Sequence, residues 1–406
     1  MSWGVALRNA VGLGLGGIPS LLNAPPYARL AFNFLSGELD PRITFTRAST
    51  GTYVNSSGVL TSAAIDTPRF DYDPVTLEAK GLLIEEQRTN ICLYSSDLTN
   101  IAWVIAANAS VTGDSSGAPD GTTTADTITV NGSNNGVFQS IACSSSTAYT
   151  FSLYVKLGTM AASDYKIAIY DNTNAAFIAS DIVPTQTPSS TAWTRVTYTF
   201  TTPATCVSVR IYCFRNALSA STSVNVWGMQ LEQGAFATSY IPTTTAAATR
   251  AADVASVTGA NFSGWFNSAQ GTMFVEAQQP VIFAASKTAA SFTDGTNANR
   301  LTLYRQASGF INAFSNPGGV ALSSGLAATA GVTWKSALAY SSSPASFSTN
   351  GITPLSLFYT VNPNVFTELA IGNAFTGGNE YFNGHIRSFK YYPTRLSNGQ
   401  LQTLTK

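Results

Sequence analysis

The middle of the chain alternates hydrophobic and polar positions with a period of two residues. One run places Phe151, Leu153 and Val155 on one side and polar or amphipathic residues on the other. Because successive side chains of a strand point to opposite faces, this pattern predicts antiparallel sheets with one buried face. Clusters of Gly, Pro, Asn and Ser bound each run, as expected for turns. Equivalent alternation recurs at 165–169, 196–200, 207–213 and 227–231.

A second all-β region is predicted in the last third of the chain. Alternation returns at 273–277 and 301–305, after a segment of small and polar residues that is typical of a linker. Residues 396–404 have the pattern of a short terminal helix with Ser397 as its N-cap. Helical periodicity is otherwise nearly absent. The predicted fold class is therefore all-β, with two antiparallel β-sandwiches.

These patterns divide the chain into four segments. The second is short and rich in turns, so we expect it to pack against the sandwich that follows rather than to fold alone. The predicted segments are an N-terminal anchoring segment at 1–29, a β-rich connecting unit at 30–90, a first sandwich at 91–248 and a second sandwich at 249–406.

The N-terminal segment is apolar and rich in glycine. Its apolar part, Ala10 to Leu22, is shorter than the about 20 residues of a membrane span, so no span is predicted. Pro25, directly after the only suitable cleavage point at Ala24, counts against a secretory signal. We interpret the segment as an extended plug that docks on a partner protein; packing on its own domain is the alternative. The predicted docking residues are Trp3, Val5, Leu7, Leu13, Leu15, Ile18, Leu21 and Leu22.

Charge is scarce in this sequence. Of 406 residues only 10% are charged, against roughly 25% in an ordinary soluble protein, and 21 basic residues balance 21 acidic ones. A nucleic-acid-binding protein or a polybasic membrane-surface protein needs a basic excess, so both classes are disfavoured. A surface of Ser, Thr, Asn, Gly and Ala has little electrostatic protection against association. This composition suits a protein that resides in a fixed assembly.

Several motifs along the chain occur together and in order. They are PRITFTRAST at 41–50, TPRFDYDP at 67–74, GLLIEEQRTN at 81–90, APDGTTTAD at 118–126, WGMQLE at 227–232, TSYIPT at 238–243 and TRAAD at 249–253. This set resembles bacteriophage and prophage virion proteins of the tail and head appendages that carry a carbohydrate-binding-module-like jelly roll. The C-terminal part, from GTMFVE at 271–276 to IRSFKYYPTRL at 386–396, is similar to concanavalin-A-like, laminin-G-type sandwiches.

The resemblance implies a virion structural protein, such as a tail fibre, tail tip or head appendage. Such a protein is assembled in the host cytoplasm, contacts other virion proteins and forms a homo-oligomer, with a trimer favoured. The N-terminus would attach it to the particle, and the sandwiches would face neighbouring subunits or host surface glycans. A purely architectural decoration or cement protein is the main alternative.

Sugar binding relies on aromatic side chains that stack on pyranose rings. Tyr154 and Tyr212 are the most informative candidates, because both interrupt the polar side of a predicted strand. The alternative for each candidate is packing in a core or a subunit interface. The predicted glycan-binding residues are Trp103, Tyr154, Tyr170, Trp193 and Tyr212.

Jelly-roll carbohydrate modules often carry a structural calcium ion held by carboxylates and backbone carbonyls. Asp120, Asp126 and Glu232 lie in the motifs of the resemblance and are the predicted calcium ligands. The alternative is a structural role at turns and strand ends. The four cysteines have no CxxC spacing, so a zinc site is not predicted. No other cofactor is expected.

The sequence predicts a binding protein rather than an enzyme. His385 is the only histidine and has no nucleophile motif beside it, so we interpret it as structural. Glu85 and Glu86 are adjacent and face opposite ways in a strand, so they cannot form a glycosidase pair. One of them is expected to pair with Arg88. An enzyme that degrades host polysaccharide is the lesser alternative.

Overall fold

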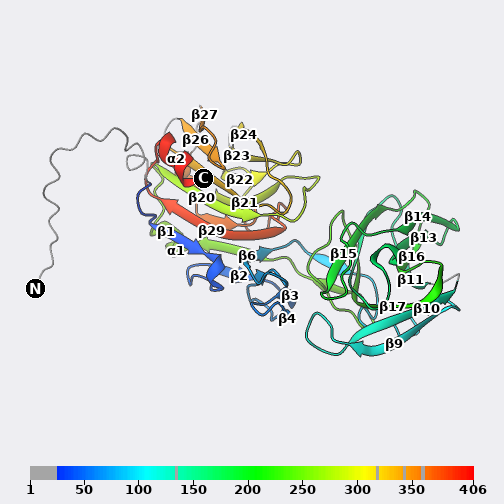
Figure 1. Ribbon diagram of the computed structural model, residues 1–406. Helices are drawn as coiled ribbons and strands as arrows, with labels where there is room; N and C mark the ends of the chain where they lie inside the picture. Colours follow the sequence, from blue (N-terminus) through cyan, green and yellow to red (C-terminus); the bar gives the residue numbers. More distant parts are fainter. Residues whose placement is uncertain (1–24, 133–135, 317–319, 342–343, 358–361) are drawn as a thin grey trace, which may run out of the picture.

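The alternating segments form strands in the computed structural model, which describes residues 25–132, 136–316, 320–341, 344–357 and 362–406. Two β-sandwiches lie side by side, and the chain passes from one to the other and back (Figure 1). This confirms the predicted all-β fold. The eight apolar residues predicted to anchor the chain, between Trp3 and Leu22, lie outside the described residues.

The jelly roll consists of two five-stranded antiparallel sheets, which we call the β12 sheet and the β16 sheet after their strands. A short 3-10 helix, η2 (Ala162–Asp164), lies between β12 and β13. The β12 sheet has the order β15 (Thr194–Thr201), β12 (Ala148–Leu157), β17 (Leu218–Gln233), β10 (Ala125–Gly132) and β9 (Ala109–Ser116). The β16 sheet has the order β14 (Ala176–Ile182), β13 (Ile167–Asp171), β16 (Ser208–Phe214), β11 (Val137–Ala142) and β8 (Val104–Ile105).

The core of the jelly roll lies between these sheets. Phe151, Leu153 and Val155 of β12 are fully buried there, opposite Ile169 and Ile211 of the β16 sheet. The alternation therefore predicted the inward face of β12 correctly. Every second residue points away from this core, so the outer faces of both sheets are where a ligand can reach the domain.

The second sandwich has a larger pair of antiparallel sheets with a separate core between them. One sheet has the order β27 (Leu355–Leu357), β26 (Ala345–Thr349), β25 (Trp334–Tyr340), β20 (Gly271–Gln278), β29 (Gly384–Tyr392), β6 (Ala79–Ile84) and β5 (Phe70–Tyr72), with β1 (Leu30–Asn33) also on β29. The other has the order β2 (Thr44–Thr46), β19 (Val254–Thr258), β28 (Glu368–Ile371), β21 (Lys287–Thr293), β22 (Arg300–Arg305), β23 (Phe310–Asn316) and β24 (Val320–Ala327).

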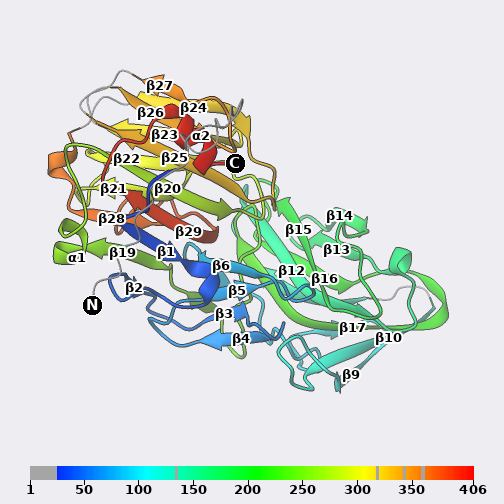
Figure 2. The same ribbon diagram turned by 60° about the vertical axis from the view of Figure 1, so that its left-hand side comes forward.

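The segment 30–90 does not pack as one unit on the jelly roll. Its strands β1, β5 and β6 extend the sheet of β29, and β2 pairs with β19. The hairpin of β3 (Gly51–Val54) and β4 (Leu60–Ala63) lies against the jelly roll (Figure 2), and β7 (Arg88–Asn90) does so too, since Asn90 Nδ2 donates to Met229 O of β17. The expectation failed because the strands that pair with this segment lie up to about 360 residues later in the sequence, and local pattern does not reveal pairing partners.

Short helices close the second sandwich. Helix α2 (Asn398–Leu404) begins at Ser397, whose hydroxyl accepts a hydrogen bond from Gln400 N in a capping box, as the sequence predicted. Among the described residues, none of the helices has the length and apolar character needed to cross a membrane. The remaining helices are α1 (Gly259–Ser263), η1 (Phe34–Ser36) and η3 (Pro363–Val365).

Gly81 opens the GLLIEEQRTN motif at a bulge between β5 and β6, with a φ of +108°. A Cβ atom at this position would lie 2.4 Å from the carbonyl oxygen of Ile386 on β29. Both the backbone conformation and the close approach of β29 therefore require glycine.

Replacement of Gly81 by alanine should lower the free energy of unfolding by about 1–3 kcal/mol, because the backbone must strain or β6 must move away from β29. Urea denaturation monitored by circular dichroism measures this loss. Gly117→Ala is the matched control, since an added Cβ there meets no atom within 4 Å. It should change stability by less than about 0.5 kcal/mol. Equal stability of the two variants would contradict the argument.

Candidate functional site

The five predicted glycan-binding aromatics occupy three different environments. Trp103 lies in the jelly-roll core, 4% exposed, and its indole N–H donates to Tyr94 O at 3.1 Å. This corrects the prediction for Trp103, because a buried ring presents no face to a sugar. The other four remain on the outer faces, two on each sheet.

Tyr170 and Tyr212 come together on the outer face of the β16 sheet. Phe138 and Tyr212 are directly opposite on β11 and β16, with ring centroids 4.7 Å apart. Tyr170 and Phe177 are opposite on β13 and β14, 4.9 Å apart, and the Phe177 ring lies 6.4 Å from that of Tyr212. These four rings form one continuous cluster across four strands.

Two arginines lie over the rings. The guanidinium carbon of Arg210 is 5.0 Å from the ring centroid of Phe138 and 5.2 Å from that of Tyr170. Arg215 covers Phe177 at 4.4 Å. Cation–π contacts of this kind hold both partners in place. We call the surface of Phe138, Tyr170, Phe177, Arg210, Tyr212 and Arg215 the ring face.

The rings of this face differ in exposure: Phe177 is exposed, Phe138 and Tyr170 are half-buried, and Tyr212 is buried, 9% exposed. Phe177 is 41% exposed, and Val104, which pairs with Phe138 at the sheet edge, is 47% exposed. Flat rings next to guanidinium groups suit a ligand that has apolar C–H faces and many hydroxyl oxygens. Sequence reasoning found Tyr170 and Tyr212 but missed Phe138 and Phe177, because only the strand register places all four side by side.

Tyr154 and Trp193 lie on the opposite side of the jelly roll, at the outer face of the β12 sheet. They pack beside Leu60 of the β3–β4 hairpin and beside Trp227, which is buried. The Trp193 indole donates to Gly117 O at 3.0 Å. The structure therefore does not bring these two aromatics together with Tyr170 and Tyr212.

The three predicted calcium ligands do not converge. Asp126 accepts hydrogen bonds from Leu98 N and Asp114 N, and Asp120 accepts from Thr122 in a turn. Glu232 is fully buried and accepts from Thr238 N at 2.7 Å. In the described part of the chain, no three His, Cys, Asp or Glu side chains gather in a way that could hold a metal ion. These residues act at turns and strand ends, which corrects the assignment.

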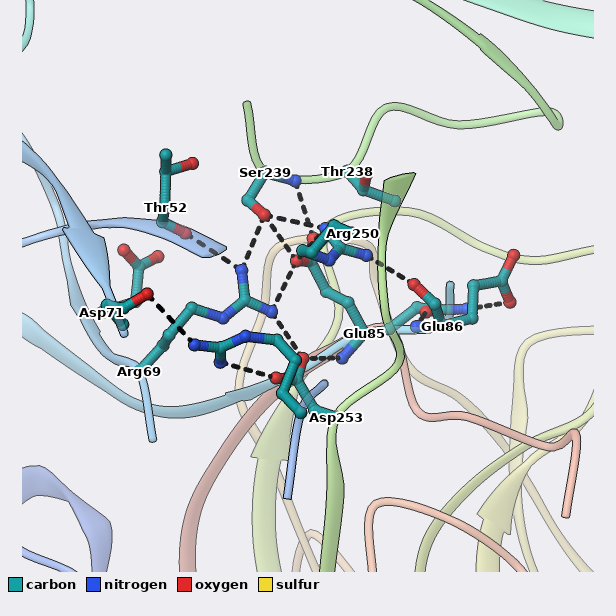
Figure 3. Close-up of polar contacts among 12 residues, drawn as sticks. Thr52, Arg69, Asp71, Glu85, Glu86, Thr238, Ser239, Arg250 and Asp253 are labelled. Atoms are coloured by element: carbon teal, nitrogen blue, oxygen red, sulfur yellow. Dashed lines mark hydrogen bonds and ion pairs between the residues drawn. The ribbon is translucent and has the colours of Figure 1, made fainter. Parts of the chain in front are cut away.

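Charged side chains are concentrated where the chain crosses between the sandwiches. The two crossing segments run side by side, with β7 (Arg88–Asn90) paired to β18 (Ala248–Arg250). Three arginines and two carboxylates are buried next to this pair (Figure 3). We call Arg47, Arg69, Glu85, Arg250 and Asp253 the charge cluster.

Each member of the charge cluster has a partner of opposite sign. Asp253 binds Arg47 at 3.1 Å and Arg69 at 2.5 Å, and Glu85 binds Arg69 at 2.8 Å and Arg250 at 2.6 Å. The extra arginine is accommodated because further N–H groups donate to backbone carbonyls. Among these acceptors are Thr52 O, Ala64 O and Glu86 O.

Glu85 is held in its ionised form. Burial by itself would raise its pKa, but the Arg250 and Arg69 guanidiniums and two hydrogen bonds from Ser239 hold the pKa well below its usual range. A carboxyl that stays ionised cannot serve as a general acid. Glu86 binds Arg88 at 2.6 Å, as the sequence predicted for one member of the pair.

His385, the only histidine, also has a structural partner. Its Nε2 lies 2.8 Å from Asp71 Oδ2, while Asp71 Oδ1 accepts a hydrogen bond from Val54 N. The pair connects β29 and β5 of the second sandwich with the β3–β4 hairpin. This agrees with the structural role predicted for His385.

The charge cluster explains most of the motifs of the sequence. Arg47 belongs to PRITFTRAST, Arg69 to TPRFDYDP and Glu85 to GLLIEEQRTN, while Arg250 and Asp253 belong to TRAAD. Ser239 of TSYIPT donates to Glu85 at 2.7 Å from both its N–H and its hydroxyl. These motifs, which are far apart in the sequence, therefore form one buried junction.

Comparison with known proteins bears on the jelly roll. Residues 99–220, which include the whole ring face, match the family described as "Carbohydrate binding domain". No curated protein sequence matches the chain. The match supports carbohydrate binding by this domain. The virion role and the concanavalin-A-like identity of the second sandwich stay predictions.

Similar solved structures belong to carbohydrate-active proteins. The CBM40 of Ruminococcus gnavus IT-sialidase has 18% identity and a TM-score of 0.31, covering 34% of this chain and 84% of that chain. Domain 4 of AbnA, a GH43 extracellular arabinanase from Geobacillus stearothermophilus, has 14% identity and a TM-score of 0.31, covering 42% and 82%. The NanB sialidase from Streptococcus pneumoniae has 13% identity and a TM-score of 0.32, covering 37% and 26%.

Removal of one carboxylate from the charge cluster should be severely destabilising. Asp253→Ala leaves Arg47 and Arg69 buried with a reduced set of acceptors, and breaking a buried pair in this way costs about 3–5 kcal/mol. Thermal and urea unfolding measure the loss. The control Asp40→Ala removes a partly exposed pair with Arg42 and should cost less than about 1 kcal/mol. If Asp253→Ala lowers stability no more than Asp40→Ala does, Asp253 does not stabilise the junction.

The charge cluster should also make stability depend on pH. Since the folded pKa of Glu85 is depressed, its contribution is complete above the unfolded pKa of about 4.3 and is lost as pH falls below it. We expect Glu85→Gln to be about 3 kcal/mol less stable than the native chain at pH 7. This difference should shrink steadily from about pH 5 to pH 3. Parallel stability profiles of the two proteins across that range would rule out the linkage.

Proposed function

We propose that this protein is a bacteriophage virion component that binds host surface glycans through the ring face of its jelly roll. The observation that carries the proposal is the ring face itself, which lies wholly inside the region matching carbohydrate-binding domains. The order of the motifs and the low charge of the chain support its place in an assembly.

The ring face would act by binding rather than by turnover. Phe177 and Tyr170 offer ring surface to the apolar C–H groups of a sugar, and Arg210 and Arg215 can donate to its hydroxyl oxygens. An open face of this kind gives weak binding at a single site. Many copies on one particle, including the expected trimer, would raise the effective affinity through multivalency.

The charge cluster supports binding over the polysaccharide-degrading alternative. A glycosidase needs two carboxyl groups that flank one sugar bond, one of them protonated. Glu85 and Asp253 are instead each held by two arginines, and Glu85 stays ionised. These acidic groups contribute to the junction and leave no acid for catalysis at this place.

Exposed apolar residues on and beside the ring face also favour the architectural alternative. Val104 and Phe177 would be covered if this face contacted another subunit. The two functions predict different results for the same substitutions. Loss of glycan binding supports a glycan-binding protein, whereas loss of assembly with intact glycan binding supports a decoration protein.

We expect Phe177→Ala and Tyr170→Ala each to weaken glycan binding about 3- to 10-fold, which corresponds to the about 0.5–1.5 kcal/mol of one aromatic contact. The chain is displayed in many copies on beads and titrated against a panel of bacterial surface polysaccharides. Light scattering of each variant reports its oligomeric mass. Tyr27→Ala is the control, because Tyr27 is a fully exposed ring outside the matched region. If no polysaccharide binds the beads, the ring face has no glycan-binding function.

A further inference from the structure

Two adjoining cavities lie on the other side of the jelly roll from the ring face. The larger cavity has a volume of about 510 Å³ and the smaller cavity about 200 Å³. Both are lined by Val54 and Leu60 of the hairpin and by Tyr154 and Arg195 of the jelly roll. They therefore form where the β3–β4 hairpin meets the outer face of the β12 sheet.

The walls of these cavities come from both sandwiches. Trp193 of the jelly roll lines the larger cavity, and Asp71 and His385 of the second sandwich line the smaller one. The charge cluster borders the smaller cavity through Glu85, and Ser239, which donates to Glu85, lines that cavity too; Figure 3 shows Asp71 and Ser239 near the cluster. The cavities therefore lie beside the junction that the charge cluster holds together.

Tyr154 has an unused hydrogen-bonding group in these cavities. Its ring packs against Trp227, but among the described residues no polar atom bonds its hydroxyl. Burial raises the pKa of Tyr154, so the hydroxyl stays protonated and can donate. The native contacts of the ring therefore leave a polar group for a ligand.

Arg195 is also incompletely paired. Its Nη2 donates to Ser152 Oγ at 3.0 Å, and its guanidinium carbon lies 5.5 Å from the ring centroid of Tyr154. Within the described residues it has no carboxylate partner in an ion pair. The cavities thus hold an arginine and a phenol with spare donors, close to the carboxylate of Asp71 as an acceptor.

We propose that the two cavities form a second saccharide-binding site, separate from the ring face. Trp193 and Tyr154 would contact the apolar faces of the sugars, and Arg195, Tyr154 and Asp71 would bind their hydroxyl groups. A mixture of apolar ring surface, donors and an acceptor matches a short oligosaccharide. This inference extends the proposed glycan-binding function to a new site, so it rests on that function for its ligand class.

The backbone around the cavities disfavours a bound peptide strand. Val54 N donates to Asp71 Oδ1 at 2.7 Å, and Leu60 N donates to Pro119 O at 3.0 Å. An added strand needs free N–H and C=O groups at a sheet edge. Because these two N–H groups of the hairpin are already used, side-chain recognition of a saccharide is the better fit.

A bound saccharide would also connect the two sandwiches. It would touch Trp193 and Arg195 on the jelly roll and Asp71 on the second sandwich at once. Anything that binds the native junction and not the unfolded chain stabilises the junction. The ring face lies within the jelly roll alone and has no such link to the second sandwich.

The test counts the saccharides bound by each full-length chain. An array of bacterial oligosaccharides of two to four sugars is probed first, and the tightest-binding oligosaccharide is then titrated by calorimetry. We expect two sites per chain in the native protein. Phe177→Ala should weaken only the ring-face site, about 3- to 10-fold, whereas Trp193→Ala or Arg195→Gln should remove only the second site. The combined changes should leave only the weakened ring-face site. Tyr154→Phe, which keeps the ring, should weaken the second site about 3- to 10-fold.

The outcomes separate this inference from the proposed function. A single site that Phe177→Ala weakens, and that Trp193→Ala and Arg195→Gln leave unchanged, overturns the second site and leaves the ring face intact. A single site that only Trp193→Ala and Arg195→Gln abolish supports the second site and overturns the ring face. No binding to any oligosaccharide overturns both. Circular dichroism and the unfolding midpoint show whether each variant is folded. If Trp193→Ala is not folded, binding by Tyr154→Phe decides whether the second site exists.

Discussion

The buried charge cluster at the junction is the constraint on which the rest of this structure depends. Taking three guanidinium groups out of water is expensive, and it is tolerated only when fixed acceptors surround them. Glu85 and Asp253 supply those acceptors from positions 168 residues apart, at the two places where the chain changes sandwich. The cluster therefore requires both crossings to lie side by side, which fixes the edge at which the sandwiches meet.

That junction gives the two outer faces of the jelly roll different characters. The hairpin of β3 and β4 covers part of the β12 sheet, so Tyr154 and Trp193 line cavities shared between domains. On the β16 sheet, Phe177 stays 41% exposed, whereas Tyr212 is buried beneath its neighbours. One domain thus presents a partly exposed aromatic surface on one side and, on the other, cavities whose lining is mainly apolar.

Much of the fold, and less of the site, could be predicted from the sequence. Alternation identified the inward residues of β12, and the capping pattern at Ser397 identified the last helix. Trp103 was misassigned because an isolated aromatic outside a clear strand carries no signal of its direction. Phe138 and Phe177 were missed because each looks like an ordinary hydrophobic residue until strand pairing places it beside Tyr212 and Tyr170.

The sequence by itself determined the class of fold, the scarcity of charge and the existence of an ordered set of motifs. Those properties are local or additive, so they can be read along the chain. Tertiary structure alone decided that Arg47, Arg69, Glu85, Arg250 and Asp253 meet, that segment 30–90 belongs mainly to the second sandwich, and which aromatic rings share a face. The physical reason is that strand pairing and buried ion pairs join residues hundreds of positions apart, and their partners are chosen by the whole fold.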